Sequence, residues 1–232
     1  SSALAMLELL PYLAGEESNN VFSTVARFAP ALAARDALLR SKVPAELFGK
    51  YRGHFAELAG GRDRAQLWSE YCQNPLADSA ELNRVALKNV RMLEATRNSD
   101  GGWGWFSSRN EASSRDTTVE AVNALLQAKS SGLAVNPAVL QQAGDYLAAA
   151  AAETVARYKD KKVLPGNIDA RVLLALTRLD RFDSELAQLL LATRTDSLSP
   201  IGLALLGRAF ALVGKNAEVE TLLTNLEQYY QS

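Results

Sequence analysis

The sequence predicts an all-α fold. Leu and Ala together supply 75 of the 232 residues, whereas Ile and Val supply only 16, and the chain contains 14 Gly and 7 Pro. Leu and Ala lose little conformational freedom on entering a helix, while β-branched residues favour strands. Apolar residues also recur at steps of three and four along most of the chain, which is the spacing of a helix face. A chain of this length can bury a sizeable core without disulfides.

The N-terminal third is predicted to hold helices separated by Pro, Gly and polar residues. Pro30 predicts a kink or a break near Phe28, because proline removes a backbone donor from the helix. The helices that we expect in this part of the chain cover 2–13, 21–40, 44–58 and 63–73.

From Asp78 onward the helix signals are clearer. Asp78 and Glu81 have the spacing of a capping box, which predicts a helix over 78–97. Asn136 and Ser199 each stand directly before a proline, a pattern typical of a helix start. The least helical stretch is 98–115, and the remaining expected helices cover 116–130, 137–158, 167–179, 183–193, 200–213 and 217–230.

Amphipathic helices, with one apolar face, alternate along the chain with helices that are apolar on nearly every side. The segments 172–176 and 201–213 belong to the second kind, which predicts that other helices cover them all round. The alternation indicates an inner layer of helices inside an outer one. An open solenoid would show a repeat of fixed length, and this sequence has none. We therefore expect a closed α/α toroid, the double layer of helices found in terpenoid cyclases and prenyltransferases. We expect a single domain over 1–232 that is a fragment of a larger multidomain protein.

The charge pattern argues against two classes of partner. The chain carries 25 basic and 26 acidic residues, interspersed, with a net charge of −1. Without a basic stripe, nucleic-acid binding is not expected. No window holds 18 uninterrupted apolar residues, so we expect no direct membrane insertion.

Four segments of the chain carry a resemblance to a known family: 9–15, 26–39, 98–106 and 198–206. They resemble the thioester domain of bacterial alpha-2-macroglobulins, which are relatives of complement components. They occur in the order of that family, and the third is the aromatic-glycine stretch Asp-Gly-Gly-Trp-Gly-Trp-Phe. The resemblance implies a toroid within a large protease trap, with neighbouring domains and proteases as partners and a periplasmic or extracellular location.

The chain departs from that family at its reactive centre. The family's Gly-Cys-x-Glu-Gln pentapeptide corresponds to residues 19–23, where this chain has Asn-Asn-Val-Phe-Ser. A thioester needs a thiol and a glutamine acyl carbon, and its good leaving group makes that carbon electrophilic. Asn20 offers no sulfur and Ser23 no acyl group, so we expect no covalent chemistry. Both residue types are instead common at helix starts, which is the alternative role that we expect for them.

The aromatic-glycine stretch is a candidate binding loop formed by Asp100, Trp103, Trp105 and Phe106, because exposed aromatic residues favour recognition. The alternative, which we favour, is that both indoles are buried and the glycines permit the turns. Asp100 and Asp116 could act as general acid and base, but a turn former and a helix cap are the commoner roles.

The single histidine and the single cysteine carry no predicted site. His54 has no second His or Cys at ligand spacing, so we expect no metal and no other cofactor. Cys72 lacks a glutamine three residues later and an identifiable histidine partner, which predicts an inert thiol.

The resemblance, taken with the substituted pentapeptide, implies a non-enzymatic domain that contributes to non-covalent trapping and inhibition of endopeptidases. Two alternatives remain open. One is a polysaccharide lyase or another enzyme on the same fold, with a basic residue as its base. The other is a helical scaffold that binds peptides.

Overall fold

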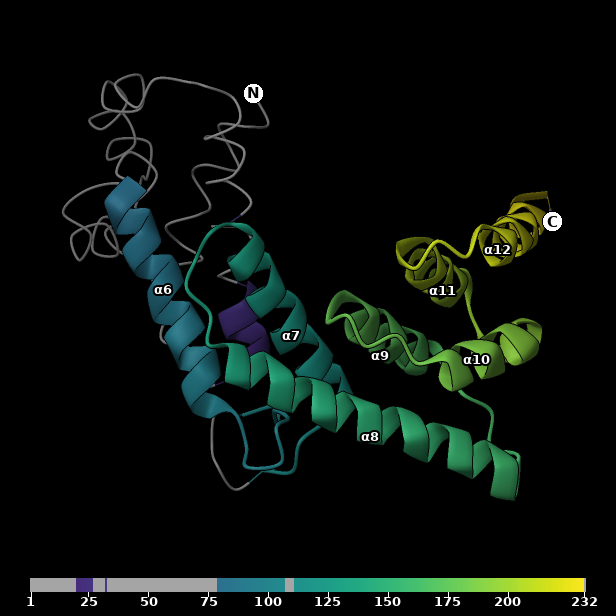
Figure 1. Ribbon diagram of the computed structural model, residues 1–232, viewed down its shortest axis with the longest axis horizontal. Helices are drawn as coiled ribbons and strands as arrows, with labels where there is room; N and C mark the ends of the chain where they lie inside the picture. Colours follow the sequence, from purple (N-terminus) through teal and green to yellow (C-terminus); the bar gives the residue numbers. More distant parts are fainter. Residues whose placement is uncertain (1–19, 27–31, 33–78, 107–110, 232) are drawn as a thin grey trace, which may run out of the picture. The chain divides into compact units, whose positions relative to one another are not determined.

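The computed structural model describes residues 20–26, 32, 79–106 and 111–231. Within them the prediction of an all-α fold is confirmed, since the regular elements are helices and the only β-type pairs are two isolated bridges. A short helix covers 21–26. The helices labelled in Figure 1 are α6 (Ser79–Thr96), α7 (Arg115–Ser130), α8 (Pro137–Lys161), α9 (Asn167–Arg178), α10 (Ser184–Ser197), α11 (Pro200–Leu212) and α12 (Asn216–Gln231).

The helices predicted from residue 78 onward are therefore confirmed, with shifts of a few residues at their ends. The helices expected over 2–13, 44–58 and 63–73 lie outside the described residues, as do His54 and Cys72. For the same reason the kink expected at Pro30 stays a prediction.

The chain divides into two compact units. The described residues of the first are 20–26, 32, 79–96, 105–106 and 124–136, and those of the second are 97–104, 111–123 and 137–231. In the second unit, α8 to α12 each contact the next helix, and α9 also packs closely against α11 (Figure 1). Closure into a toroid and a single domain over 1–232 stay predictions.

Local capping explains where the helices of the second unit begin. Asp183 accepts a hydrogen bond from the Leu186 amide at 2.9 Å, and Ser199 accepts one from the Gly202 amide at 3.5 Å. Each bond satisfies an amide that has no partner within its own helix. Pro200 follows Ser199 at the first helical position, where its missing N–H costs nothing.

Two helices were expected to be covered by other helices on all sides. The expectation is confirmed for residues 172–176 of α9 and is wrong for α11. Residues 172–176 of α9 are all buried. In α11, Leu203, Leu206 and Phe210 are buried, but Ile201 is 71% exposed and Leu212 56% exposed. The helices that pack on α11 within the second unit cover one face only, although both faces are apolar in sequence.

A buried polar network ties α7, α8 and α9 together. Asp169, only 5% exposed, accepts hydrogen bonds from Thr154 at 2.7 Å, from the Gly166 amide at 2.8 Å and from Arg115 at 3.1 Å. Arg115 also donates to Thr154 at 2.8 Å and pairs with Glu153 at 2.9 Å. Because the buried carboxylate has a counter-ion, a hydroxyl donor and an amide donor, its desolvation is compensated.

Candidate functional site

The first half of the aromatic-glycine stretch belongs to the second unit and forms a tight turn. Asp100 accepts hydrogen bonds from the Gly102 amide at 3.0 Å and from the Ser113 hydroxyl at 2.8 Å. The Asn98 amide donates to the Gly102 carbonyl at 2.9 Å and closes the turn. Asp100 is thus held as a turn former, the role that the sequence favoured.

Two glycines in this turn are required by their surroundings. Gly101 has a φ of +93°, and a Cβ there would overlap the backbone carbonyl of Gln142. A Cβ on Gly102 would lie 2.6 Å from the Cβ of Ser113. Glycine alone among the amino acids has no Cβ, so it lets the backbone come this close to its neighbours.

Trp103 is a core residue. Its side chain is 0% exposed. Its amide donates to the Thr118 hydroxyl at 3.0 Å, and its carbonyl accepts from the Ser114 amide at 2.9 Å. The expectation that the indole is buried is confirmed for Trp103, which leaves no surface there for a ligand.

Asp116 does not cap α7. The cap is Ser114, whose hydroxyl accepts from the Thr117 amide at 3.1 Å. Asp116 lies in the first turn and forms an ion pair with Arg171 at 2.8 Å. Because Asp100 and Asp116 are each engaged in structural bonds, the geometry does not present them as an acid–base pair.

Asn20 caps the helix at 21–26 in the first unit. Its side-chain oxygen accepts a hydrogen bond from the Ser23 amide at 2.7 Å, and its carbonyl accepts from the Thr24 amide at 3.2 Å. Thr24 is buried, and its hydroxyl lies 3.4 Å from the sulfur of Met92 on α6. The capping role considered from the sequence is therefore observed for Asn20.

The second half of the aromatic-glycine stretch pairs with this helix start. The Val21 amide donates to the Trp105 carbonyl at 3.1 Å, and Asn20 and Phe106 form an antiparallel bridge. The rings of Phe22 and Trp105 lie 4.6 Å apart at an angle of 34°. Two segments more than 80 residues apart in sequence therefore meet at one place.

We define the aromatic patch as the ring pair of Phe22 and Trp105 together with Phe106, the next residue in the sequence. Trp105 is 48% exposed and Phe106 55% exposed, while Phe22 is partly buried below Trp105. The expectation that both indoles are buried is wrong for Trp105. Exposed aromatic side chains offer a large apolar contact area, which is favourable for recognition.

The structure thus brings together Asn20, Ser23, Trp105 and Phe106 in one unit, and Asp100 and Trp103 in the other. Sequence reasoning missed Phe22, because nothing in the local pattern indicates that it stacks on a residue in a distant loop. It also missed the contact between Arg115 and Asp169, which lie 54 residues apart.

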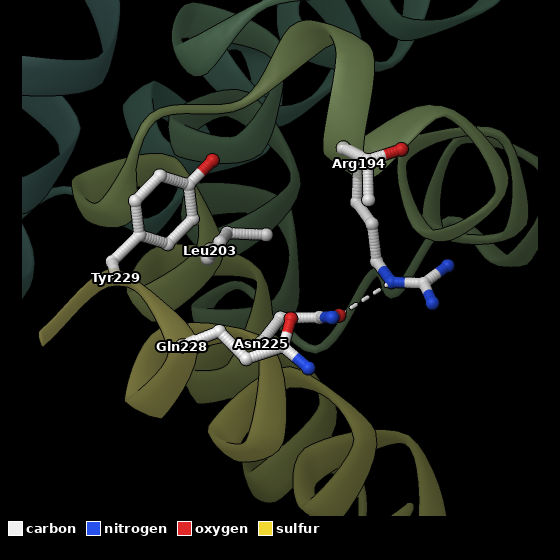
Figure 2. A pocket seen from close by; sticks show the side chains of 6 residues that line it. Arg194, Leu203, Asn225, Gln228 and Tyr229 are labelled. Atoms are coloured by element: carbon white, nitrogen blue, oxygen red, sulfur yellow. Dashed lines mark hydrogen bonds between the residues drawn. The ribbon is translucent and has the colours of Figure 1, made fainter. Parts of the chain in front are cut away.

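A pocket of about 210 Å³ lies in the second unit (Figure 2). Arg194 donates to Asn225 at 2.7 Å and to the Leu191 carbonyl at 2.7 Å, so that two guanidinium nitrogens are already engaged. The pocket contains neither a carboxylate nor a cysteine, and its side chains present no catalytic pair. Its lining residues are Arg194, Thr195, Leu203, Asn225, Gln228 and Tyr229.

One group near the turn has a shifted pKa. Burial raises the pKa of Tyr146 above its ordinary value of 10.0, and the nearby charge of Asp100 raises it further. Arg115 acts in the opposite direction, but the net shift is upward. The phenol therefore stays neutral in the folded protein to a higher pH than in the unfolded chain.

Neither a metal cluster nor a membrane span is found in the part of the chain that the structure covers. No group of three or more His, Cys, Asp or Glu side chains is arranged there to hold a metal ion. None of the helices described is both long enough and apolar enough to cross a membrane.

The fold is similar to a region of bacterial alpha-2-macroglobulins. The native Escherichia coli protein matches 96% of this chain with a TM-score of 0.61 at 13% identity, and a fragment of it from domain MG7 to the C-terminus matches 95% with a TM-score of 0.60 at 13% identity. Salmonella alpha-2-macroglobulin reacted with methylamine matches 95% with a TM-score of 0.61 at 17% identity.

The region of similarity is a small part of each of these proteins. The match spans 12% of the native E. coli chain, 30% of its C-terminal fragment and 13% of the Salmonella chain. No protein-family model and no curated protein sequence matches this chain. The similarity is therefore one of fold.

Proposed function

We propose that this chain is a non-catalytic domain of an alpha-2-macroglobulin-like protein, equivalent to a thioester domain that has no thioester. The observation that carries the proposal is the similarity of fold over 95–96% of the chain, taken together with the residues at positions 19–23. Where the family's pentapeptide would place Cys and Gln, this chain has Asn20 and Ser23.

The geometry at these two positions supports the absence of covalent chemistry. The side chain of Asn20 is engaged in a cap bond to the Ser23 amide at 2.7 Å. A carboxamide oxygen in this bond stabilises the start of a helix and provides no leaving group. The helix start therefore keeps a structural role without an electrophile.

The aromatic patch is the surface through which this domain would bind another protein. It lies beside the helix start, and its two outer side chains are about half exposed. We assign it to contact with a neighbouring domain or a trapped protease. In the whole protein, inhibition of endopeptidases would then be non-covalent, by enclosure, and the protein would act in the periplasm or outside the cell.

Methylamine labelling tests the loss of the thioester. The natural full-length polypeptide is incubated with methylamine and its intact mass is measured, with Salmonella alpha-2-macroglobulin as the positive control, since that protein has been reacted with methylamine. We expect no mass increase for the present protein. An adduct located at residues 19–23 would overturn the proposal.

Protease trapping tests the role of the aromatic patch. The full-length polypeptide is mixed with an endopeptidase, and cleavage of a large protein substrate is compared with cleavage of a small peptide substrate. Enclosure predicts protection of the large substrate only. The double variant Trp105→Ala/Phe106→Ala should weaken protection, while Leu223→Ala, which changes an exposed apolar residue on α12, should not. Full protection by the double variant would exclude a role of the aromatic patch in trapping the protease.

A further inference from the structure

Helix α11 presents an apolar face that the second unit leaves uncovered. Its exposed positions recur at steps of three and four residues, so they lie on one side of the helix. The buried positions Leu203, Leu206 and Phe210 lie on the opposite side, against the rest of the unit. The exposed residues are Ile201, Ala204, Arg208, Ala211 and Leu212.

Two arginines, Arg208 of α11 and Arg178 of α9, have no acidic partner among the residues that the structure describes. Arg208 is exposed and carries the only charge of α11, and among the described residues no carboxylate pairs with it. Arg178, in the last turn of α9, donates to the neutral side chain of Asn123 at 2.6 Å. By contrast, Arg171 on the same helix pairs with Asp116 and Glu120.

The two arginines act on each other. Burial lowers the pKa of Arg178, and the positive charge of Arg208 lowers it further. Helices α9 and α11 pack against each other, and the effect of Arg208 on Arg178 means that the two guanidinium groups lie near one another. An anionic group bound between them would reduce this repulsion and provide the missing hydrogen-bond acceptors.

We propose that the α11 surface, defined as Ile201, Ala204, Arg208 and Leu212 together with Arg178 of α9, binds an acidic amphipathic helix of a partner protein. Aliphatic side chains of that helix cover Ile201 and Leu212, and its carboxylates pair with Arg208 and Arg178. We infer this kind of partner from the apolar and positively charged side chains of the surface. Two guanidinium groups beside exposed aliphatic side chains complement a helix that carries carboxylates next to leucine.

A pair of synthetic peptides tests the proposal. One is a fluorescent amphipathic helix with Leu on one face and Glu at its margins, and the other has Lys at every Glu position. Binding to the intact protein is measured by fluorescence anisotropy. We expect saturable binding of the Glu peptide, weakened by salt, and at least tenfold weaker binding of the Lys peptide.

Matched variants locate the binding. Arg208→Glu and Arg178→Glu should each weaken binding of the Glu peptide roughly tenfold, because an attraction becomes a repulsion. Ile201→Asp should weaken it through the apolar contact. The control is Arg157→Glu, which makes the same charge change at an exposed position of α8 and should leave binding unchanged. Circular dichroism shows whether each variant remains folded.

Three results would overturn the proposal. Equal binding of both peptides would show that charge plays no part, and unchanged binding by Arg208→Glu would place the contact elsewhere. Self-association in light scattering that Ile201→Asp abolishes would show that a second copy of the chain covers this surface. Because none of these readouts involves methylamine or a protease, failure here leaves the proposed function standing.

Discussion

Trp103 and Trp105 stand two residues apart in one short motif, yet they have opposite roles. Trp103 is fully buried in the second unit, with its amide and carbonyl both bonded to the start of α7. Trp105 belongs to the first unit, where it is half exposed and stacked on Phe22. The motif is therefore a boundary between two packing environments.

The difference shows that two tryptophans of the same motif can serve different purposes, one stabilising the fold and the other open to contact with a partner. A buried indole stabilises the fold through its large apolar surface and the contacts around it. An exposed indole contributes less to stability and can contact another protein. Replacing each tryptophan should therefore lower the free energy of unfolding by a different amount.

Trp103→Ala should have the largest effect. Removing a fully buried indole is expected to lower the free energy of unfolding by about 3–5 kcal/mol, because it leaves a cavity. Trp105→Ala serves as the matched variant and should cost about 1 kcal/mol, mainly the stacking on Phe22. Urea denaturation of both variants gives the comparison, and equal losses would contradict it.

Gly101→Ala should rank second. The new Cβ would overlap the Gln142 carbonyl at a residue whose φ is +93°, so we expect a loss of about 2 kcal/mol or more. Gly132→Ala is the control, because Gly132 also has a positive φ but no atom within 4 Å of the added Cβ. If thermal melts of the two variants shifted equally, backbone conformation rather than crowding would explain both.

Asn20→Ala tests the first unit, in which the helix start at Asn20 pairs with the segment that contains Trp105. Losing the cap bond to the Ser23 amide should cost about 1 kcal/mol, while Asn20→Asp, which keeps an acceptor, should cost little. Hydrogen exchange at the amides of residues 21–26 reports on this local effect. Unchanged protection in Asn20→Ala would show that the cap does not stabilise this helix.

Tyr146→Phe should have the smallest effect, and only at alkaline pH. The folded state raises the pKa of Tyr146 above 10.0, so this residue contributes stability below pH 10 that is lost as the pH rises through the folded-state value. The variant has no phenol to ionise and should lose less stability above pH 10. Urea midpoints measured between neutral and alkaline pH test the direction, and identical pH profiles would contradict the shift.

Much of the local structure could be predicted from the sequence. The helices from α6 to α12 were expected at nearly their observed bounds, because a cap such as Ser199 acts on residues within one turn of itself. The absence of Cys and Gln at positions 20 and 23 is likewise a matter of residue identity. These conclusions need no knowledge of distant contacts.

Tertiary structure decided which apolar surfaces are covered. Nothing near Trp105 in sequence indicates that it stacks on Phe22, and nothing in α11 distinguishes Ile201, which is exposed, from Leu203, which is buried. Hydrogen bonds within a turn depend on neighbouring residues, whereas burial depends on which remote segment packs against a side chain. For this reason the sequence determined the helices and the residues at positions 20 and 23, and the packing of remote segments determined the surfaces available to a partner.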